Sequence, residues 1–141
     1  MSNTERADGA TEALVAGAGP VGMAAALALD AHGVSTAILE AEPADRERPG
    51  SRANYVHGAT LQILEDVHPG LGTRVADSGV VCPTRRTFWK GTEVFSRTYS
   101  DPGGSGGLPH FTSLPQVTVE EYLLDALRER GVDPEDAVFI S

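Results

Sequence analysis

An α/β fold built on a parallel β-sheet is predicted by the pattern of the first 40 residues. A short apolar run, Leu14 to Ala16, leads directly into a glycine-rich turn, and an apolar helical pattern follows that turn. A second short apolar run, Thr36 to Leu39, comes after the helix. Two strands joined through one helix lie parallel in the same sheet. The chain is therefore expected to begin with a strand–helix–strand unit.

The turn after the first strand contains glycines with the spacing G-x-G-x-x-G. Gly17 is predicted to make the sharp turn off the strand, Gly19 to let a pyrophosphate approach the backbone, and Gly22 to let the helix lie close to the sheet. Pro20 suits the first helical turn because it has no N–H to leave unpaired. The free N–H groups around it and the positive end of the helix dipole attract phosphate oxygens. Gly33 is expected to end the helix.

An acidic residue follows the second strand. Glu40 lies about 20 residues beyond the glycines, where the dinucleotide fingerprint places a carboxylate that accepts hydrogen bonds from ribose hydroxyls. The blander interpretation is that the glycines only form a tight turn. Since strand, turn, helix, second strand and acid all occur in order, the sequence predicts a Rossmann-like fold that binds FAD or NAD(P), with a small antiparallel β-hairpin excursion.

Composition limits the classes of partner. The 141 residues are 40% hydrophobic, enough for one globular domain, and the net charge of −9 disfavours binding to nucleic acid or to an anionic membrane. A single cysteine, Cys82, excludes an internal disulfide framework, and no spacing resembles a zinc site. Because no such spacing occurs, no metal site is expected. The polar first dozen residues and the lack of an apolar run approaching about 18 residues indicate a soluble, cytoplasmic protein.

The remaining elements are read from local patterns. Thr118 and Glu121 form a candidate capping box for the last helix. The expected elements are a tail over 1–11, a polar loop after Glu40, helices over 58–67 and 71–78, hairpin strands over 80–89 and 93–99, a glycine-rich loop over 101–107, a helix over 118–131 and a strand over 137–140. A strand at the end of the chain suggests that the sheet continues in residues not present, so the fold is expected to be incomplete.

Three stretches carry a resemblance to a family. They are Val15 to Met23 together with Glu40, Ser51 to Leu64, and Leu114 to Leu124 together with the Leu-Arg-Glu-Arg-Gly that begins at Leu127. In this order they resemble the N-terminal part of the class A flavoprotein monooxygenases, the para-hydroxybenzoate hydroxylase-like aromatic hydroxylases. The resemblance implies FAD as cofactor, NADH or NADPH as transient reductant, oxygen, and an aromatic, phenolic or polyketide-like substrate.

The resemblance also implies a domain plan. Residues 12–79 would form the ADP-binding portion, 80–113 the start of a substrate-domain hairpin, and 114–141 the returning helix and strand of the FAD-binding domain. Family members are several hundred residues long, so the chain is expected to stop before the catalytic chamber is complete. The remaining polypeptide would then be its partner, and no catalytic residue can be assigned. The sequence leaves open whether the chain forms a homodimer.

The cofactor-binding residues are carried over position by position. The glycine turn and Glu40 would hold the ADP half of FAD, Arg52 would lie beside the flavin and pyrophosphate, and Gln116 would contact the cofactor from the start of its helix. The full expected set is Gly17, Gly19, Pro20, Val21, Gly22, Glu40, Ala41, Arg52 and Gln116. Relatives often carry basic residues where this chain has Ala41 and Ala59, which puts some contacts to the adenosine and phosphate end in doubt.

Two other functions are compatible with these patterns. A fragment of an NAD-dependent dehydrogenase would use Glu40 equally well, although the second and third stretches argue against it. A truncated or non-catalytic nucleotide-binding subunit would do no chemistry itself. Other conspicuous side chains are given structural roles: Cys82 is expected to be buried or half-buried, Phe88, Trp89 and Phe95 to pack in the hairpin, and Arg85 and Arg86 to form a solvated strand edge.

Overall fold

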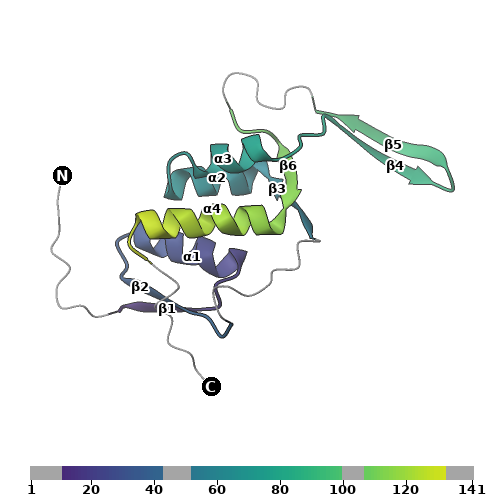
Figure 1. Cartoon of the computed structure of the whole chain (residues 1–141). Coiled ribbons are helices and arrows are strands. Elements are labelled where there is room, and N and C mark those ends of the chain that lie inside the picture. Colours follow the sequence, from purple (N-terminus) through teal and green to yellow (C-terminus); the bar gives the residue numbers. More distant parts are fainter. Residues whose placement is uncertain (1–10, 43–51, 100–106, 133–141) are drawn as a thin grey trace. The chain divides into compact units, whose positions relative to one another are not determined.

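The computed structural model describes residues 11–42, 52–99 and 107–132, and their ribbon is shown in Figure 1. The chain divides into two compact units, one of Met1–Glu47 with Leu123–Ser141 and the other of Arg48–Tyr122. Each unit is described by itself. The expected strand over 137–140, the N-terminal tail up to residue 10 and most of the glycine-rich loop lie outside the described residues.

The first unit contains the predicted strand–helix–strand arrangement. Strand β1 spans Ala13–Ala16, helix α1 spans Pro20–Ala31 and strand β2 spans Thr36–Leu39. The strands pair in parallel, in an unbroken register from Ala13 opposite Thr36 to Ala16 opposite Leu39. The prediction of a parallel sheet started by a βαβ unit is therefore confirmed.

Helix α1 buries one face and ends at a glycine. Its buried side chains, Met23, Ala26 and Leu27, recur at the three- and four-residue spacing that places them on one side of a helix. At its end Gly33 has a φ of +81°, its N–H donates to the Asp30 carbonyl at 2.9 Å, and the next N–H donates to the Leu29 carbonyl at 3.0 Å. A left-handed glycine with these two bonds is the helix stop that the sequence predicts.

The second unit is built on a pair of antiparallel strands and two helices. Strand β3, Ala53–His57, pairs with strand β6, Phe111–Pro115, and helices α2, Gly58–Val67, and α3, Leu71–Ser78, pack beside them. The helix boundaries are those predicted from the sequence. The core of this unit consists mainly of aliphatic side chains: Val56, Leu61, Leu64, Leu71, Val75, Ala76, Leu114 and Val119.

Helices α2 and α3 meet at a close corner. A Cβ at Gly72 would overlap the backbone carbonyl oxygen of Leu61, so only glycine lets the two helices approach this closely. The side chain of Glu65 then spans the corner. Its Oε1 accepts the Gly70 N–H at 2.8 Å, and its Oε2 accepts the Thr73 N–H at 2.9 Å. A carboxylate from α2 thus caps the unsatisfied N–H groups at the start of α3.

The hairpin consists of strands β4, Thr84–Trp89, and β5, Thr92–Thr98. Both residues of its turn have positive φ, +48° at Lys90 and +82° at Gly91, which matches the right-handed twist of a two-residue hairpin. The predicted hairpin is confirmed, but the expected packing of Phe88, Trp89 and Phe95 is wrong, because each is at least half exposed. A two-stranded ribbon offers no second layer for such side chains.

Helix α4 spans Gln116–Glu129 and contributes residues to both units. It begins two residues before the predicted start, so Thr118 lies within its first turn and the predicted capping box is wrong. Its end is as predicted: Gly131 has a φ of +74°, and its N–H donates to the Arg128 carbonyl at 2.9 Å. Arg130, the residue after the last residue of the helix, forms a salt bridge with Asp30 of the first unit, with 3.0 Å between its guanidinium nitrogen and the carboxylate oxygen.

The Glu65 cap makes stability depend on pH. The N–H groups of Thr73 and then Gly70, which donate to the carboxylate, hold the pKa of Glu65 below its ordinary value. A lowered pKa means that the ionised side chain stabilises the fold above the ordinary glutamate pKa, and that this contribution is lost as pH falls through the lowered one. Glu65→Gln should therefore reduce the free energy of unfolding by about 1 kcal/mol at neutral pH.

Urea unfolding of both chains from pH 7 to pH 2.5 measures this effect. The difference between wild type and variant should shrink on acidification through the pKa of Glu65. Glu121→Gln, which removes the same charge from an exposed side chain of α4, is the control and should change stability little. A Glu65→Gln difference that stays constant across the pH range would contradict the capping role.

Candidate cofactor site

The glycine turn has the backbone geometry expected of a phosphate-binding loop. Gly17 adopts a φ of +101°, and its N–H donates to the Leu39 carbonyl at 2.6 Å, which joins the turn to the end of β2. A Cβ at Gly22 would overlap the Gly17 carbonyl oxygen and would lie 3.3 Å from Cγ1 of Val15. Gly22 therefore lets α1 lie against β1, as predicted.

Gly19 differs from the other two glycines. It has an extended backbone, with φ −77° and ψ 177°, and a Cβ built on it would meet no described atom within 4 Å. No constraint within the described fold thus requires a glycine at this position. The sequence predicts a different reason for glycine at this position: a pyrophosphate could approach the backbone closely where no Cβ is present.

The N-terminus of α1 opens onto this turn. Gly19 is the N-cap and supplies no side-chain hydrogen bond, and Pro20 occupies the first helical position. Val21 is 81% exposed, an unusual exposure for a valine at the start of a helix whose other face is buried. An uncapped helix start with its positive dipole end is suited to an anion.

Glu40 lies beside the glycine turn. Its Oε2 accepts the N–H of Ala18 at 2.7 Å, and its Oε1 accepts the N–H of Glu42 at 3.0 Å. The acid and the turn, 22 residues apart in sequence, are thus brought together at the carboxyl end of the parallel strands. Ligands of open α/β sheets bind at this edge. Ala41 follows as an exposed residue.

Arg52 and Gln116 meet in the second unit. The backbone N–H of Gln116 donates to the Arg52 carbonyl at 2.8 Å, which joins the start of β3 to the start of α4. The Arg52 side chain is exposed, whereas the Gln116 side-chain amide donates to Oε1 of Glu120 at 2.7 Å. Two residues that the resemblance assigned to one cofactor are therefore neighbours, although 64 positions separate them in the sequence.

Glu120 is a residue that the sequence reasoning missed. It is only 6% exposed and fixes the orientation of the Gln116 amide. The sequence does contain a sign of this contact: Glu120 lies four residues after Gln116, and residues at i and i+4 are neighbours on a helix. That signal was hidden because the helix was expected to begin at Thr118, after Gln116. The described residues include no group of three or more His, Cys, Asp or Glu side chains suited to a metal, and none of their helices is long and apolar enough to cross a bilayer.

Comparison with known proteins agrees with this geometry. The profile of a family described as "FAD binding domain" matches residues 10–138. The chain belongs to this FAD-binding family. The family comprises the class A flavoprotein monooxygenases that the sequence resembles, and FAD is the cofactor that its domain binds.

Two curated relatives are monooxygenases by name. The chain is 30% identical over 129 residues to a flavin-dependent monooxygenase of Mycobacteroides abscessus, covering 86% of this chain and 26% of the relative. It is 32% identical over 123 residues to the uncharacterized aromatic compound monooxygenase YhjG of Bacillus subtilis, covering 86% of this chain and 23% of the relative. The chain therefore spans about a quarter of the length of these relatives.

Solved structures show the same fold. One is 2-methyl-3-hydroxypyridine-5-carboxylic acid oxygenase, with a TM-score of 0.68 and 26% identity over 86% of this chain and 30% of that one. Another is p-nitrophenol 4-monooxygenase PnpA from Pseudomonas putida DLL-E4, with a TM-score of 0.66 and 26% identity over 83% of this chain and 29% of that one. The predicted Rossmann-like, FAD-binding fold is confirmed.

The contrast between Gly19 and Gly22 predicts opposite effects of one substitution. Gly22→Ala should destabilise the fold by about 1 to 3 kcal/mol, because the new methyl group overlaps the Gly17 backbone. Gly19→Ala should leave the free energy of unfolding unchanged or raise it by up to about 1 kcal/mol, since the φ of this residue suits alanine. The same substitution should weaken FAD binding, because its methyl group would stand where the pyrophosphate is predicted to approach the backbone.

Thermal unfolding and FAD fluorescence titration of the two variants separate these effects. Each variant serves as the control for the other, because the chemical change is identical and the positions are three residues apart. If Gly19→Ala bound FAD as tightly as the wild type, the pyrophosphate would not approach the backbone at that residue.

Proposed function

We propose that this chain is the FAD-binding part of an NAD(P)H- and oxygen-dependent monooxygenase that hydroxylates an aromatic substrate. The observation that carries the proposal is the Glu40 carboxylate held against the glycine turn at the start of α1, in a chain of the FAD-binding family. The names of the two curated relatives and of p-nitrophenol 4-monooxygenase support the reaction class.

The residues of the first unit would bind the ADP half of FAD. The N–H groups at the start of α1 would face the pyrophosphate, with Gly19 providing close backbone approach and Val21 lying at the exposed helix end. The Glu40 carboxylate would accept hydrogen bonds from the adenosine ribose. Ala41, next along the chain, is small enough to leave the adenosine side uncovered.

The residues of the second unit would act near the flavin. The Arg52 guanidinium would neutralise phosphate charge, and Gln116, whose amide is fixed by Glu120, would present a preset hydrogen-bonding group. When bound, the flavin supplies electron transfer from NAD(P)H to oxygen. The protein's own part is to hold the cofactor, to orient the substrate and to exclude water.

The proposal extends to the domain plan and the partners. Residues 12–79 would carry the ADP site, 80–113 the first hairpin of a substrate-binding region, and 114–141 the return to the FAD-binding region. The remaining polypeptide of the enzyme would complete the catalytic chamber, and the protein would act in the cytoplasm on a small aromatic molecule.

Glu40 is the most direct test. Glu40→Ala should weaken FAD binding by about 1 to 3 kcal/mol through loss of charge-assisted hydrogen bonds to the ribose. Flavin fluorescence titration measures the affinity, and circular dichroism checks that the fold persists. Glu42→Ala removes the same charge two residues away while keeping the backbone N–H that Glu40 accepts, and should bind FAD like the wild type. Equal affinities for all three proteins would remove Glu40 from the site.

Catalysis by the isolated chain is a second test. The 141-residue chain supplied with FAD, NADH or NADPH and phenolic substrates should show no substrate-dependent oxidation of the reductant, because the proposal places the catalytic chamber partly in other polypeptide. Reductant consumption followed at 340 nm, with product detected by chromatography, measures this. Hydroxylated product formed by the chain alone would show that it contains the complete catalytic apparatus.

A further inference from the structure

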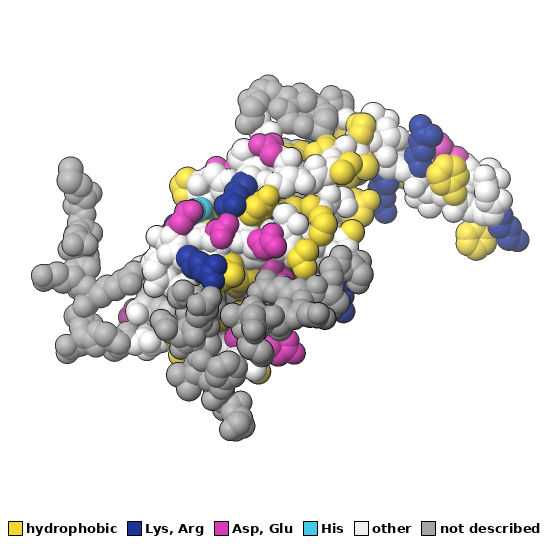
Figure 2. All heavy atoms as spheres, in the orientation of Figure 1, with side chains coloured by type: hydrophobic (Ala, Val, Ile, Leu, Met, Phe, Trp, Pro, Cys, Tyr) yellow, Lys and Arg dark blue, Asp and Glu magenta, His cyan; other side chains and the backbone are white. Residues whose placement is uncertain are grey.

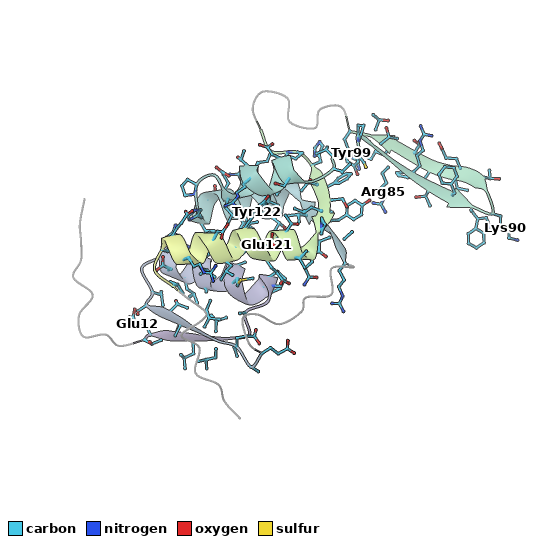
Figure 3. The ribbon with its side chains drawn as sticks, in the orientation of Figure 1. Glu12, Arg85, Lys90, Tyr99, Glu121 and Tyr122 are labelled. Atoms are coloured by element: carbon cyan, nitrogen blue, oxygen red, sulfur yellow. The ribbon has the colours of Figure 1, made fainter. Side chains whose placement is uncertain are left out.

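The β4–β5 hairpin has a surface that the described part of the chain leaves uncovered. The two strands form a sheet by themselves, and no other described strand pairs with either outer edge. Every residue of the two strands is exposed except Thr84, which is half-buried. Figure 3 shows Arg85 and Tyr99 at the base of the hairpin and Lys90 at its far end. Both outer edges therefore present backbone groups that a further strand can pair with.

Large apolar side chains lie on this surface. Trp89 is 68% exposed, Val94 59%, Phe88 58% and Phe95 50%. Figure 2 shows both hydrophobic and basic side chains on the hairpin. A two-stranded hairpin alone is at best marginally stable in water, and additional strands stabilise it. A free, apolar strand edge is the place where such a strand adds.

Charge distinguishes the two edges. Strand β4 contains two adjacent basic residues, Arg85 and Arg86, and no acidic one. Pairing β4 with β4 of a second copy would bring these guanidinium groups together, and like charges across a strand pair are destabilising. Strand β5 contains one acidic and one basic residue, Glu93 and Arg97, each two positions from Phe95. Two antiparallel copies of β5 are thus complementary in charge, so β5 is the edge suited to a second copy of this chain.

The register follows from this symmetry. When two β5 strands are antiparallel and centred on Phe95, the two Phe95 rings stand opposite each other and share one face of the sheet. Arg97 of each copy then lies at the end of the sheet where the other copy has Glu93. Val94, the extra residue of β5 in its ladder with β4, adjoins the centre and adds apolar surface there.

The charges within each hairpin favour the same register. Arg97 stands opposite Arg85 in the β4–β5 ladder, so two like charges are opposed. Arg97 lies over the Tyr99 ring at 5.1 Å and has no carboxylate partner among the described residues. Glu93 lies 3.7 Å from Arg86, a contact between exposed side chains that contributes little to stability. A carboxylate of a second copy at the Arg97 end would offset the repulsion between the opposed arginines.

We propose that the hairpin dimerises the chain, with β5 paired antiparallel to β5 of a second copy about a two-fold axis at Phe95. The two hairpins then form one four-stranded sheet, and the backbone groups of both β5 edges gain hydrogen-bond partners. Such a contact is isologous, so it closes as a dimer. This inference goes beyond the proposed function and requires no bound FAD.

The oligomeric state of the 141-residue chain is the first test. Sedimentation velocity over about a hundredfold range of protein concentration should show a monomer–dimer equilibrium, because association depends on protomer concentration. A chain that grows beyond the dimer would overturn the proposal. A chain that stays monomeric throughout would also overturn it, and would leave the β5 edge to the remaining polypeptide of the enzyme.

Charge reversal separates the interface from the stability of the hairpin. Arg97→Glu replaces the repulsion from Arg85 by an attraction, so the hairpin itself should be at least as stable as in the wild type. The same change puts like charges at both ends of the interface and should raise the dimer dissociation constant at least about tenfold. Adding Glu93→Arg restores opposite charges and should return the dissociation constant to within about threefold of the wild type.

Lys90→Glu is the control for these variants, because it makes an equal change of charge at the hairpin turn, away from the axis. It should alter the dissociation constant less than about twofold. An Arg97→Glu chain that dimerises as tightly as the wild type would show that β5 is not the contact.

A disulfide tests the register directly. Cys82 is the only cysteine, so in a Cys82→Ser background Phe95→Cys would place one thiol of each copy at the axis, at a Cα separation that a disulfide allows. Oxidation should convert most of this variant to a covalent dimer. Trp89→Cys, on β4 and at least as exposed, should remain largely monomeric under the same conditions. Equal cross-linking at both positions would contradict the register.

FAD binding gives a separate readout on the same samples. It is measured by flavin fluorescence and depends on Glu40, which belongs to the first unit, whereas the hairpin belongs to the second. A monomeric chain that binds FAD would overturn the dimer and leave the proposed function intact. Dimerisation of a chain that fails to bind FAD would have the reverse meaning.

Discussion

The close approach of α1 to β1 is the constraint on which the cofactor site depends. It exists because no Cβ separates Gly22 from the Gly17 carbonyl. The same approach sets where the helix begins, and therefore where its uncapped N–H groups and positive dipole end lie. The Glu40 carboxylate reaches the turn only because β2 pairs beside β1 in this register. This backbone contact and the pairing of the two strands thus set where the helix start and the Glu40 carboxylate lie.

Much of this fold is predictable because its signals are local. The strand, the glycine turn, the helix stop at Gly33 and the acid at Glu40 follow from backbone requirements that few residues meet. The hairpin turn at Lys90 and Gly91 and the helices of the second unit are equally explicit in the sequence. Family resemblance added Arg52 and Gln116, which no periodicity would have paired, and the structure makes them hydrogen-bonded neighbours. Their contact with the cofactor stays a prediction.

The features that sequence reasoning missed depend on tertiary contacts. The Glu65 cap requires α2 and α3 to fold back on each other at Gly72, and nothing in either helix alone indicates that corner. Cys82 was expected to be at least half-buried and is exposed, because the chain before β4 has no covering layer in the described unit. Arg85 and Arg86 are exposed on β4, as the sequence predicts, although the register that places Arg85 opposite Arg97 is visible only once β4 and β5 pair.

The hydrogen bond between the Glu40 carboxylate and the Ala18 N–H joins the two parts of the predicted ADP site, the acid for the ribose and the loop for the pyrophosphate. The group that would read the ribose is anchored on the loop that would read the pyrophosphate, so neither can shift without disturbing the other. Since this bond is present in the chain without a ligand, both groups are positioned before a dinucleotide arrives, and binding carries no added cost of ordering one against the other.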